Sequence, residues 1–550
     1  MTDEPALHDG RDALCPTCHD KSLPHSQTHN SPADQPRDGT RPHSRLLRPS
    51  QEFQQARDVP TTTVDPPETT RSDFHRQRVL LVNASHTFDT DLLIIGGGSA
   101  GFAAAIEARQ LGARVIMVEQ STLGGTCVNA GCVPSKFFLR AAELAHLAAT
   151  HPYRGIETSL DAVDLAALRR QQHTLIAALR AEKYEALVDY YGWELIRGTA
   201  SFLDPETVVV RQRRIRPRAT LLATGARPAI PPLPGLLDVP FLTSTSALDL
   251  ERLPRSLVIL GAGFVALELG QAFQRLGAAV TLVQRRPRLL PEVEPEIAEA
   301  LQQALASEGL QFLLGTQVQR IDRTPSGIRL LITRGEREET LDADAVLVAS
   351  GRLPNTEALN LPPAQIAVDN RGAPIIDATL RTTNPRVYAA GDVVLTPQFV
   401  SVAAAAGRIA TRNALLGENR PFNLAAVPAV LFTDPQLATV GLTRAQAIAA
   451  GYDLRTGFAP AAVIARERVN FQPYGGVLVL ADSESGHLLS VQAVASAAGE
   501  LIDAAALAIA HRLTLNDLRE HLAPYLTCAE GLRLAALAAS QDIAHLSCCA

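Results

Sequence analysis

The chain has 550 residues, far more than one small domain needs, so several domains with buried cores are expected. Hydrophobic residues make up 46% and charged residues 20%, which is typical of a globular protein and excludes disorder throughout. The formal net charge of -6 and the pI near 6.2 give no basic surface for nucleic acid or an anionic membrane. No apolar run is long enough to span a membrane, and the polar, acidic start does not predict a signal peptide. We therefore expect a cytoplasmic protein.

Residues 1–86 are rich in Pro, His, Arg, Thr and Asp and show no apolar periodicity, so we predict a disordered tail. The tail carries Cys15 and Cys18, followed by His19. This spacing fits a haem attachment pattern, but nothing around it predicts a haem pocket. A loose site for soft metal ions is the stronger alternative, and a tail without a folded role stays open.

A first nucleotide-binding unit begins near residue 89, where the composition changes. The predicted elements are a buried strand, a turn, a helix and a second strand at residues 91–95, 96–101, 102–111 and 114–119. The turn contains Gly96, Gly98 and Gly101, which would let a pyrophosphate approach the backbone and the helix N-terminus. Glu119 ends the second strand, where a carboxylate accepts hydrogen bonds from a ribose. The pattern therefore predicts a dinucleotide site.

The same pattern recurs 165 residues later, at residues 256–284. Its turn residues are Gly261, Gly263 and Ala266. Gln284 replaces the acidic residue, and Arg285 and Arg286 follow it. Because two guanidinium groups would attract a 2′-phosphate that a carboxylate repels, we expect NADPH at this second site. The alternative is an arginine-rich surface turn without a ligand.

The rest of the chain completes an α/β fold. Three strand ends carry the motifs Ala223-Thr-Gly-Ala-Arg-Pro228, Ala349-Ser-Gly-Arg352 and Ala389-Ala-Gly-Asp392. From about residue 426, short strands and helices predict a separate α+β domain. We expect a first dinucleotide domain at residues 87–243, a second at 244–370, a return to the first at 371–425 and the α+β domain at 426–550.

Cys127 and Cys132 lie between the first unit and a predicted apolar helix at residues 137–148. A nearby helix N-terminus and Lys136 would lower their thiol pKa values. Such thiolates can exchange electrons or bind soft metals. A zinc site is disfavoured, because no second cysteine or histidine pair has the spacing of a zinc finger.

The segment Gly124-Gly-Thr-Cys-Val-Asn-Ala-Gly-Cys-Val-Pro-Ser-Lys136 resembles the redox-active disulfide of the flavoprotein disulfide reductases, the pyridine nucleotide-disulfide oxidoreductases. Within that family, which includes glutathione reductase and dihydrolipoyl dehydrogenase, the segment is most similar to the mercuric reductases. The resemblance covers roughly residues 89–550, with all motifs in order. It implies a glutathione-reductase-like fold of two Rossmann-like domains and a dimerisation domain, with FAD at the first site, NADPH at the second and an active site shared between two subunits.

The resemblance also implies residue roles. Cys132 would be the thiolate beside the flavin, Cys127 the outer thiol that meets the substrate, and Lys136 the partner of Glu268. Asp392 would bind the ribityl chain of FAD. Further positions that would line FAD are Ala100, Thr126, Ala200, Thr224, Gly225 and Val400.

The carboxy-terminal segment differs from that of organic disulfide reductases, which resemble one another in a terminal His-Pro-Thr-x-x-Glu motif. Aligning Glu530 with the Glu of this motif places Tyr525 where the proton-donating His would stand. His521 lies four residues too early, although a shifted register would restore it. The segment therefore favours a substrate other than an organic disulfide, with Tyr525 orienting or transiently coordinating a metal.

The chain ends with Cys548 and Cys549, adjacent cysteines that are unsuited to a stable structural disulfide. As thiolates on a mobile tail they could bind a thiophilic cation and pass it to another thiol pair. The resemblance implies that they deliver Hg(II), bound as a thiol complex, to Cys127 and Cys132 of the partner subunit. Cys528 is either an extra thiol ligand or, as we favour, a small buried residue.

Together with these patterns, the resemblance implies an NADPH-dependent flavoenzyme that reduces Hg(II) to Hg(0). Two alternatives are an NADPH- or NADH-dependent reductase of an organic disulfide and a protein that sequesters thiophilic metals. The lack of the terminal His opposes the first alternative. The retained Lys136, Glu268 and Asp392 oppose the second.

Overall fold

The computed structural model describes residues 88–394 and 397–546. The predicted disordered tail, its Cys15 and Cys18, and the terminal Cys548 and Cys549 lie outside the described residues. No helix within the described ranges is long and apolar enough to cross a membrane.

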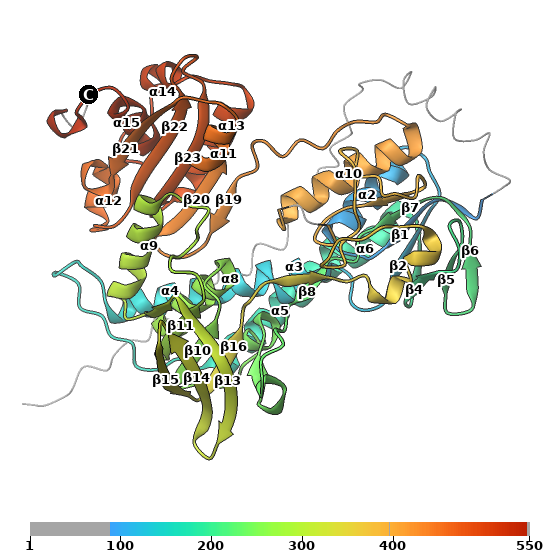
Figure 1. Ribbon diagram of the computed structural model, residues 1–550, viewed down its shortest axis with the longest axis horizontal. Helices are drawn as coiled ribbons and strands as arrows, with labels where there is room; N and C mark the ends of the chain where they lie inside the picture. The colour runs from blue at the N-terminus through green and yellow to red at the C-terminus, as the bar shows by residue number, and fades with distance from the viewer. Residues whose placement is uncertain (1–87, 395–396, 547–550) are drawn as a thin grey trace, which may run out of the picture. The chain divides into compact units, whose positions relative to one another are not determined.

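The first nucleotide-binding unit is a five-stranded parallel sheet with the order β18-β7-β1-β2-β3. Its strands are β1 (Thr90–Ile95), β2 (Val115–Glu119), β3 (Glu194–Arg197), β7 (Pro217–Leu222) and β18 (Val387–Ala389). Helix α2 (Ser99–Gln110) packs against α10 (Val400–Leu416), as Figure 1 shows. The two helices approach so closely that a Cβ on Gly407 would lie 2.2 Å from the Ala100 carbonyl oxygen. The predicted helix start at residue 102 is corrected to Ser99, because the glycine turn is shorter than expected.

The second unit repeats this plan with the strand order β12-β11-β10-β16-β9, again all parallel. Its strands are β9 (Phe241–Leu242), β10 (Ser256–Leu260), β11 (Ala279–Gln284), β12 (Gln311–Leu314) and β16 (Ala345–Val348), and its helices are α8 (Phe264–Arg275) and α9 (Pro295–Ser307). An antiparallel sheet of β13 (Thr316–Thr324), β14 (Gly327–Arg334) and β15 (Arg337–Ala343) is added after β12 (Figure 1).

Strand pairing refines the limits of the second unit. Strand β9 already belongs to its sheet, before residue 244. Strand β17 (Arg352–Pro354) pairs with β8 (Ala226–Pro228), and Leu359 and Leu361 pack in one core with Leu93 of β1. The chain therefore returns to the first unit before residue 370, and the pairings favour boundaries near residues 241 and 352. A three-stranded sheet of β4 (Ala200–Phe202), β5 (Val208–Val210) and β6 (Arg213–Ile215) shares that core.

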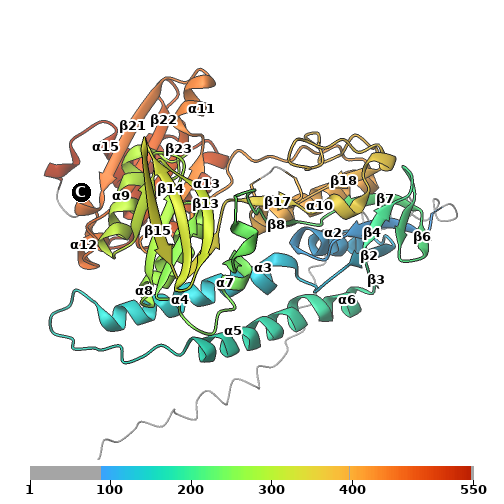
Figure 2. The same ribbon diagram turned by 60° about the horizontal axis from the view of Figure 1, so that its bottom comes forward.

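The thiol segment is helical on both sides of Gly131. Helix α3 spans Gly125–Ala130 and α4 spans Cys132–Ala149, five residues longer at its start than the predicted helix. Pro134 fits because it lies in the first turn, where the backbone N–H has no partner within the helix. Helix α5 (Leu165–Arg180) runs beside α4 in Figure 2, and the Gln172 side chain donates to the Pro134 carbonyl at 3.0 Å. This helix continues through a π-helical turn (Ala181–Glu185) into α6 (Ala186–Tyr191).

The last domain is a five-stranded antiparallel sheet with the order β19-β20-β23-β22-β21. Its strands are β19 (Ala429–Leu431), β20 (Gln436–Gly441), β21 (Leu454–Pro460), β22 (Gly476–Asp482) and β23 (Leu488–Ala495). Helix α13 (Ala498–Ala510) packs on β20 and β23, and α15 (Glu530–Ala538) packs on β21 and β22. Shorter helices are α7 (Ser244–Ala247) in the second unit and α11 (Arg444–Ala449), α12 (Ala465–Val469) and α14 (Leu515–Glu520) here. Two parallel sheets and one α+β domain confirm the predicted fold class.

Candidate functional site

The two thiols of the candidate site are held at a break between helices. Cys127 lies on α3 and is half-buried, and Cys132 is the first residue of α4 and is exposed. A hydrogen bond from the Cys127 thiol and the nearby Lys136 charge outweigh burial and lower the pKa of Cys132 to about 7. The same hydrogen bond, together with burial, raises the pKa of Cys127. Cys132 is therefore readily deprotonated to the thiolate, and the Cys127 thiol donates a hydrogen bond to it.

Lys136 lies one helical turn after Cys132 and forms an ion pair with Glu268 of α8, with Nζ 2.9 Å from Oε2. The Glu268 side chain is only 8% exposed. Its other oxygen accepts a hydrogen bond from the Phe432 backbone N–H at 3.0 Å, and Lys136 Nζ lies 4.3 Å from the centre of the Phe432 ring. The structure thus brings together the two residues that the family resemblance paired.

The first glycine turn forms a cradle for a pyrophosphate. A Cβ on Gly101 would lie 2.0 Å from the Gly96 carbonyl oxygen, and a Cβ on Gly125 would lie 2.8 Å from the Gly98 Cα. Gly98 is the N-cap of α2 and offers no side-chain cap, so backbone N–H groups of the first turn are available to an anion. Glu119, at the end of β2, accepts the Gly97 N–H at 2.7 Å. These residues fit the adenosine and pyrophosphate part of FAD.

Asp392 and Arg352 form a second part of this site. The Arg352 Nε lies 3.8 Å from an Asp392 carboxylate oxygen, too far for a hydrogen bond, and it is buried without another partner. Burial raises the pKa of Asp392 and lowers that of Arg352. A half-buried carboxylate and an unsatisfied guanidinium N–H both favour polar partners, and the hydroxyl groups of a ribityl chain would supply them.

The remaining predicted FAD positions lie on several elements of the first nucleotide-binding unit and on α3. Ala100 is buried in α2, Ala200 begins β4, Val400 begins α10 and Thr126 lies exposed on α3. Thr224 donates its hydroxyl to the Asn355 carbonyl at 2.7 Å, and the Asn355 N–H donates to the Gly225 carbonyl at 3.0 Å. Backbone atoms, more than side chains, would therefore contact the cofactor.

The second glycine turn also leaves space for a phosphate. Apart from Gly263 and its two chain neighbours, no heavy atom of the described residues lies within 4 Å of the position that a Cβ on Gly263 would occupy, and Gly263 caps α8 without a side-chain hydrogen bond. Gly261 has a φ of 117°, and Ala266 is fully buried in α8. Gln284 ends β11 and is followed by the exposed Arg285 and Arg286, of which Arg286 lies 3.4 Å from Glu292. This site fits a second dinucleotide.

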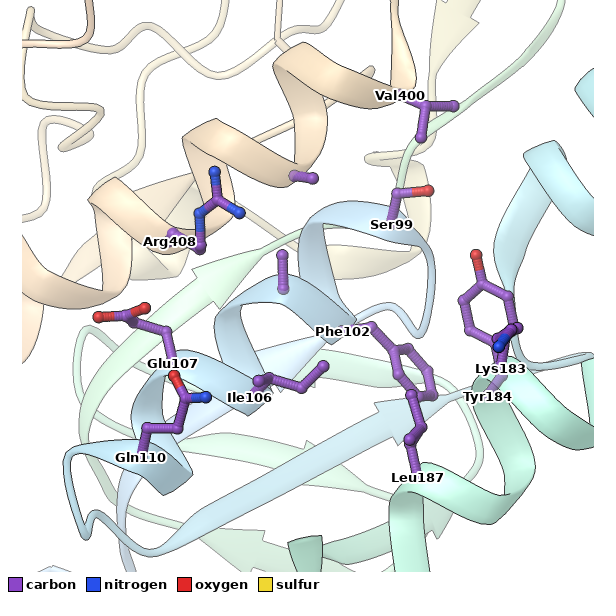
Figure 3. Close-up of a pocket in the computed structure, with 12 residues that line it drawn as sticks. Ser99, Phe102, Ile106, Glu107, Gln110, Lys183, Tyr184, Leu187, Val400 and Arg408 are labelled. Carbon is purple, nitrogen blue, oxygen red and sulfur yellow. The ribbon is translucent and has the colours of Figure 1, made fainter. Parts of the chain in front are cut away.

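Sequence reasoning missed Tyr184, which lies in the π-helical turn beside the thiols. It forms a hydrogen bond with Ser99, and its pKa is raised by burial and by the nearby Cys127. A pocket of about 430 Å³ is lined by α2, α10 and the π-helical turn, with Tyr184, Lys183 and Phe102 on one side and Arg408 and Glu107 on the other (Figure 3). Irregular turns within helices often occur at functional sites, but an isolated Tyr among charged residues gave no signal in the sequence.

The carboxy-terminal candidates lie in the last domain. Tyr525 is 51% exposed in the segment between α14 and α15, and His521 is exposed at the end of α14. Cys528 is buried, as expected for a small packing residue. Among the described residues, no group of three or more His, Cys, Asp or Glu side chains is arranged to hold a metal ion.

Comparisons with known proteins agree with this arrangement. Over 462 residues the chain is 46% identical to a mercuric reductase of Staphylococcus aureus, covering 84% of each protein. It is 42% identical to a mercuric reductase of Streptomyces lividans over 466 residues, covering 84% of this chain and 98% of the relative. The solved structure of the HOCl-induced flavoprotein disulfide reductase RclA from Escherichia coli, as its Cu(II) complex, superposes with a TM-score of 0.73 at 29% identity, covering 82% of this chain and 99% of that one.

Family models match most of the folded chain. Residues 90–407 match the pyridine nucleotide-disulphide oxidoreductase model, and residues 427–536 match the dimerisation domain of the same family. This match implies FAD and a nicotinamide nucleotide as cofactors, and it points to a homodimer. With two glycine cradles, a thiol pair and the Lys136–Glu268 ion pair in the arrangement described above, this chain belongs to the pyridine nucleotide-disulphide oxidoreductase family.

Proposed function

We propose that this chain is a mercury(II) reductase, which converts NADPH and Hg(II) to NADP⁺, a proton and Hg(0). Two electrons leave the nicotinamide and two reach the metal, so the reaction balances. The observation that carries the proposal is the reactive thiol pair beside Lys136, in a chain whose relatives at 42–46% identity are named mercuric reductases.

The cofactor and the chain's own residues would have different roles in this reaction. Bound FAD would supply the two-electron chemistry that links a nicotinamide to a dithiol. Cys127 and Cys132 would hold Hg(II), because thiolates are the preferred ligands of soft metal ions. Lys136 favours the thiolate form of Cys132, and Glu268 keeps the Lys136 ammonium in place. Elemental mercury, once formed, has little affinity for thiolates and would leave.

Residues of the partner subunit would complete the site. Tyr525 of one subunit would orient Hg(II) near the thiol pair of the other, and Cys548 and Cys549 would deliver the metal by ligand exchange. The exposed position of Tyr525 in the dimerisation domain supports this arrangement. The absence of a His at this position in the sequence supports a metal ion over an organic disulfide, whose leaving thiolate must take up a proton.

A second candidate function is the reduction of a small organic disulfide. The lowered pKa of Cys132 favours it, because a thiolate can also attack a disulfide. A third function, metal sequestration without turnover, is opposed by the retained ion pair between Lys136 and Glu268.

One assay separates these functions. Purified FAD-loaded protein is given NADPH, excess external thiol and one of Hg(II), oxidised glutathione or oxidised lipoamide. We expect rapid NADPH oxidation with Hg(II) and loss of volatile mercury, because reduction of a thiol-bound metal ion, unlike that of an organic disulfide, needs no proton donor for a leaving thiolate. Faster turnover of either disulfide would contradict the proposal. A Cys548→Ala/Cys549→Ala protein in the same assay should lose turnover mainly with Hg(II) held by bulky thiols.

The pKa of Cys132 gives a pH prediction. In the reduced protein, Cys132 should react with iodoacetamide at a rate that rises with pH around a midpoint near 7, because the thiolate is the nucleophile. Cys127→Ala removes the main hydrogen bond and should move the midpoint upward, and Lys136→Met should also raise it. Site-resolved mass spectrometry of the alkylated peptide measures both shifts.

Arg140→Met provides the matched control for Lys136→Met, since Arg140 lies one turn further along α4 and pairs with Glu143. Its effect on the alkylation midpoint should be small. An unshifted midpoint in both the Cys127→Ala and Lys136→Met proteins would show that these groups do not set the reactivity of Cys132.

The second dinucleotide site makes a prediction about cofactor choice. Arg285→Ala/Arg286→Ala should raise KM for NADPH about tenfold or more, because each guanidinium that bonds a phosphate contributes a charge-assisted hydrogen bond. KM for NADH should change little. The control is Arg288→Ala, whose side chain donates to the Pro291 carbonyl at 2.8 Å. Equal changes for the two nucleotides would argue against a 2′-phosphate site at these arginines.

A further inference from the structure

The short helix α12 (Ala465–Val469) forms hydrogen bonds with the segment that carries Tyr525, about 60 residues later in the sequence. The Arg466 Nε donates to the Leu526 carbonyl at 2.7 Å. The Cys528 thiol donates to the Glu467 Oε1 at 2.9 Å. These hydrogen bonds fix the segment at Leu526 and at Cys528, one and three residues after Tyr525.

Glu467 is a fully buried carboxylate, with 0% of its surface exposed. Its oxygens accept hydrogen bonds from the Ser496 backbone N–H at 3.2 Å, from the Ser496 hydroxyl at 2.8 Å and from the Cys528 thiol. All three donors are neutral groups. A fully buried carboxylate depends on its hydrogen-bond donors, so each of them is important to the local structure.

Cys528 is suited to remain a donor. Burial and the hydrogen bond to Glu467 raise its pKa to about 12, so the thiol keeps its proton near neutral pH. Its burial also limits the access of Hg(II) to the sulfur atom. The side chain is therefore placed to hold its neighbours and not to compete with Cys127 and Cys132 for the metal.

The backbone between these two anchors has an unusual conformation. Leu526 has a φ of 58°, in the left-handed region that side chains with a Cβ rarely adopt. The Thr527 hydroxyl donates to the Pro524 carbonyl at 2.8 Å and closes the turn. Such a conformation persists only where the surroundings enforce it, and here α12 supplies contacts directly at and after Leu526.

We propose that Glu467 and Cys528 are positioning residues that fix Tyr525 for the metal. The thiol–carboxylate hydrogen bond and the bond from Arg466 to Leu526 hold the turn, and the turn presents the Tyr525 side chain at the surface of the dimerisation domain. This inference rests on the proposed function, in which Tyr525 of one subunit reaches the thiol pair of its partner.

The test uses the full-length, FAD-loaded protein with NADPH and Hg(II) in excess cysteine. Cys528→Ala should lower kcat/KM for Hg(II) about tenfold, because the buried carboxylate loses a donor and the turn loosens. Cys528→Ser keeps a donor and should stay within about threefold of the parent protein. NADPH-driven reduction of the Cys127/Cys132 disulfide, measured by thiol counting, should be unchanged in both variants.

A double-mutant cycle distinguishes positioning from general destabilisation. If Cys528 acts through Tyr525, adding Cys528→Ala to a Tyr525→Phe protein should lower kcat/KM no further. The matched control is Ser490→Ala, which removes another buried hydrogen bond of the same domain, from Ser490 to the Val440 carbonyl at 3.3 Å. It should lower thermal stability without lowering kcat.

Three results would overturn the inference: a Cys528→Ala protein with normal turnover, a Cys528→Ser protein as impaired as Cys528→Ala, or effects of Cys528→Ala and Tyr525→Phe that multiply. Failure of the parent protein to reduce Hg(II) is a separate result. It would overturn the proposed function, and the inference with it.

Discussion

The buried carboxylate of Glu268 is the point at which three parts of the chain meet. One oxygen accepts the Lys136 ammonium from α4, and the other accepts the Phe432 N–H at the start of the dimerisation domain. A carboxylate that is 8% exposed is costly unless it is paired and hydrogen-bonded, so these contacts stabilise one another. Lys136 is held where its charge acts on Cys132, one turn earlier on the same helix face.

This constraint gives the two thiols different properties. The hydrogen bond between them and the charge of Lys136 favour a thiolate at Cys132, while Cys127 keeps its proton. A pair of this kind can receive electrons as a disulfide or bind a soft cation as a dithiol. The substrate that can approach the thiol pair depends on the groups around it. These groups are Tyr184 beside Cys127 and, in our proposal, Tyr525 of the partner subunit. Neither group is a proton donor of the histidine type, which favours a metal ion as the substrate.

Features encoded within a few consecutive residues could be predicted from the sequence. The glycine turns and the flanking strands follow from local motifs. The Lys136–Glu268 pair joins residues far apart in the sequence and was expected only from the resemblance to the disulfide reductases. The helical conformation of the thiol segment was not predicted from the sequence, because Gly, Asn and Pro lower helix propensity. The structure has two helices here, separated by a break at Gly131.

Contacts between distant segments could not be predicted. Tyr184 lies near Cys127 because α5 runs beside α4 and continues into the π-helical turn that carries Tyr184. Cys528 and Glu467 are 61 residues apart and meet only when α15 packs on β21 and β22. The limits of the second nucleotide domain depend on the pairing of β9 with β16 and of β17 with β8, which no local sequence pattern predicts.

The most direct test of the central claim is to record NADPH oxidation and elemental mercury release at the same time, for the parent protein and for Cys132→Ser. If the chain is a mercury(II) reductase, the parent protein should release one Hg(0) for each NADPH oxidised. Cys132→Ser should release no mercury enzymatically, because the reactive thiolate is gone. NADPH oxidation without mercury release by the parent protein, or release by Cys132→Ser at the parent rate, would contradict this claim.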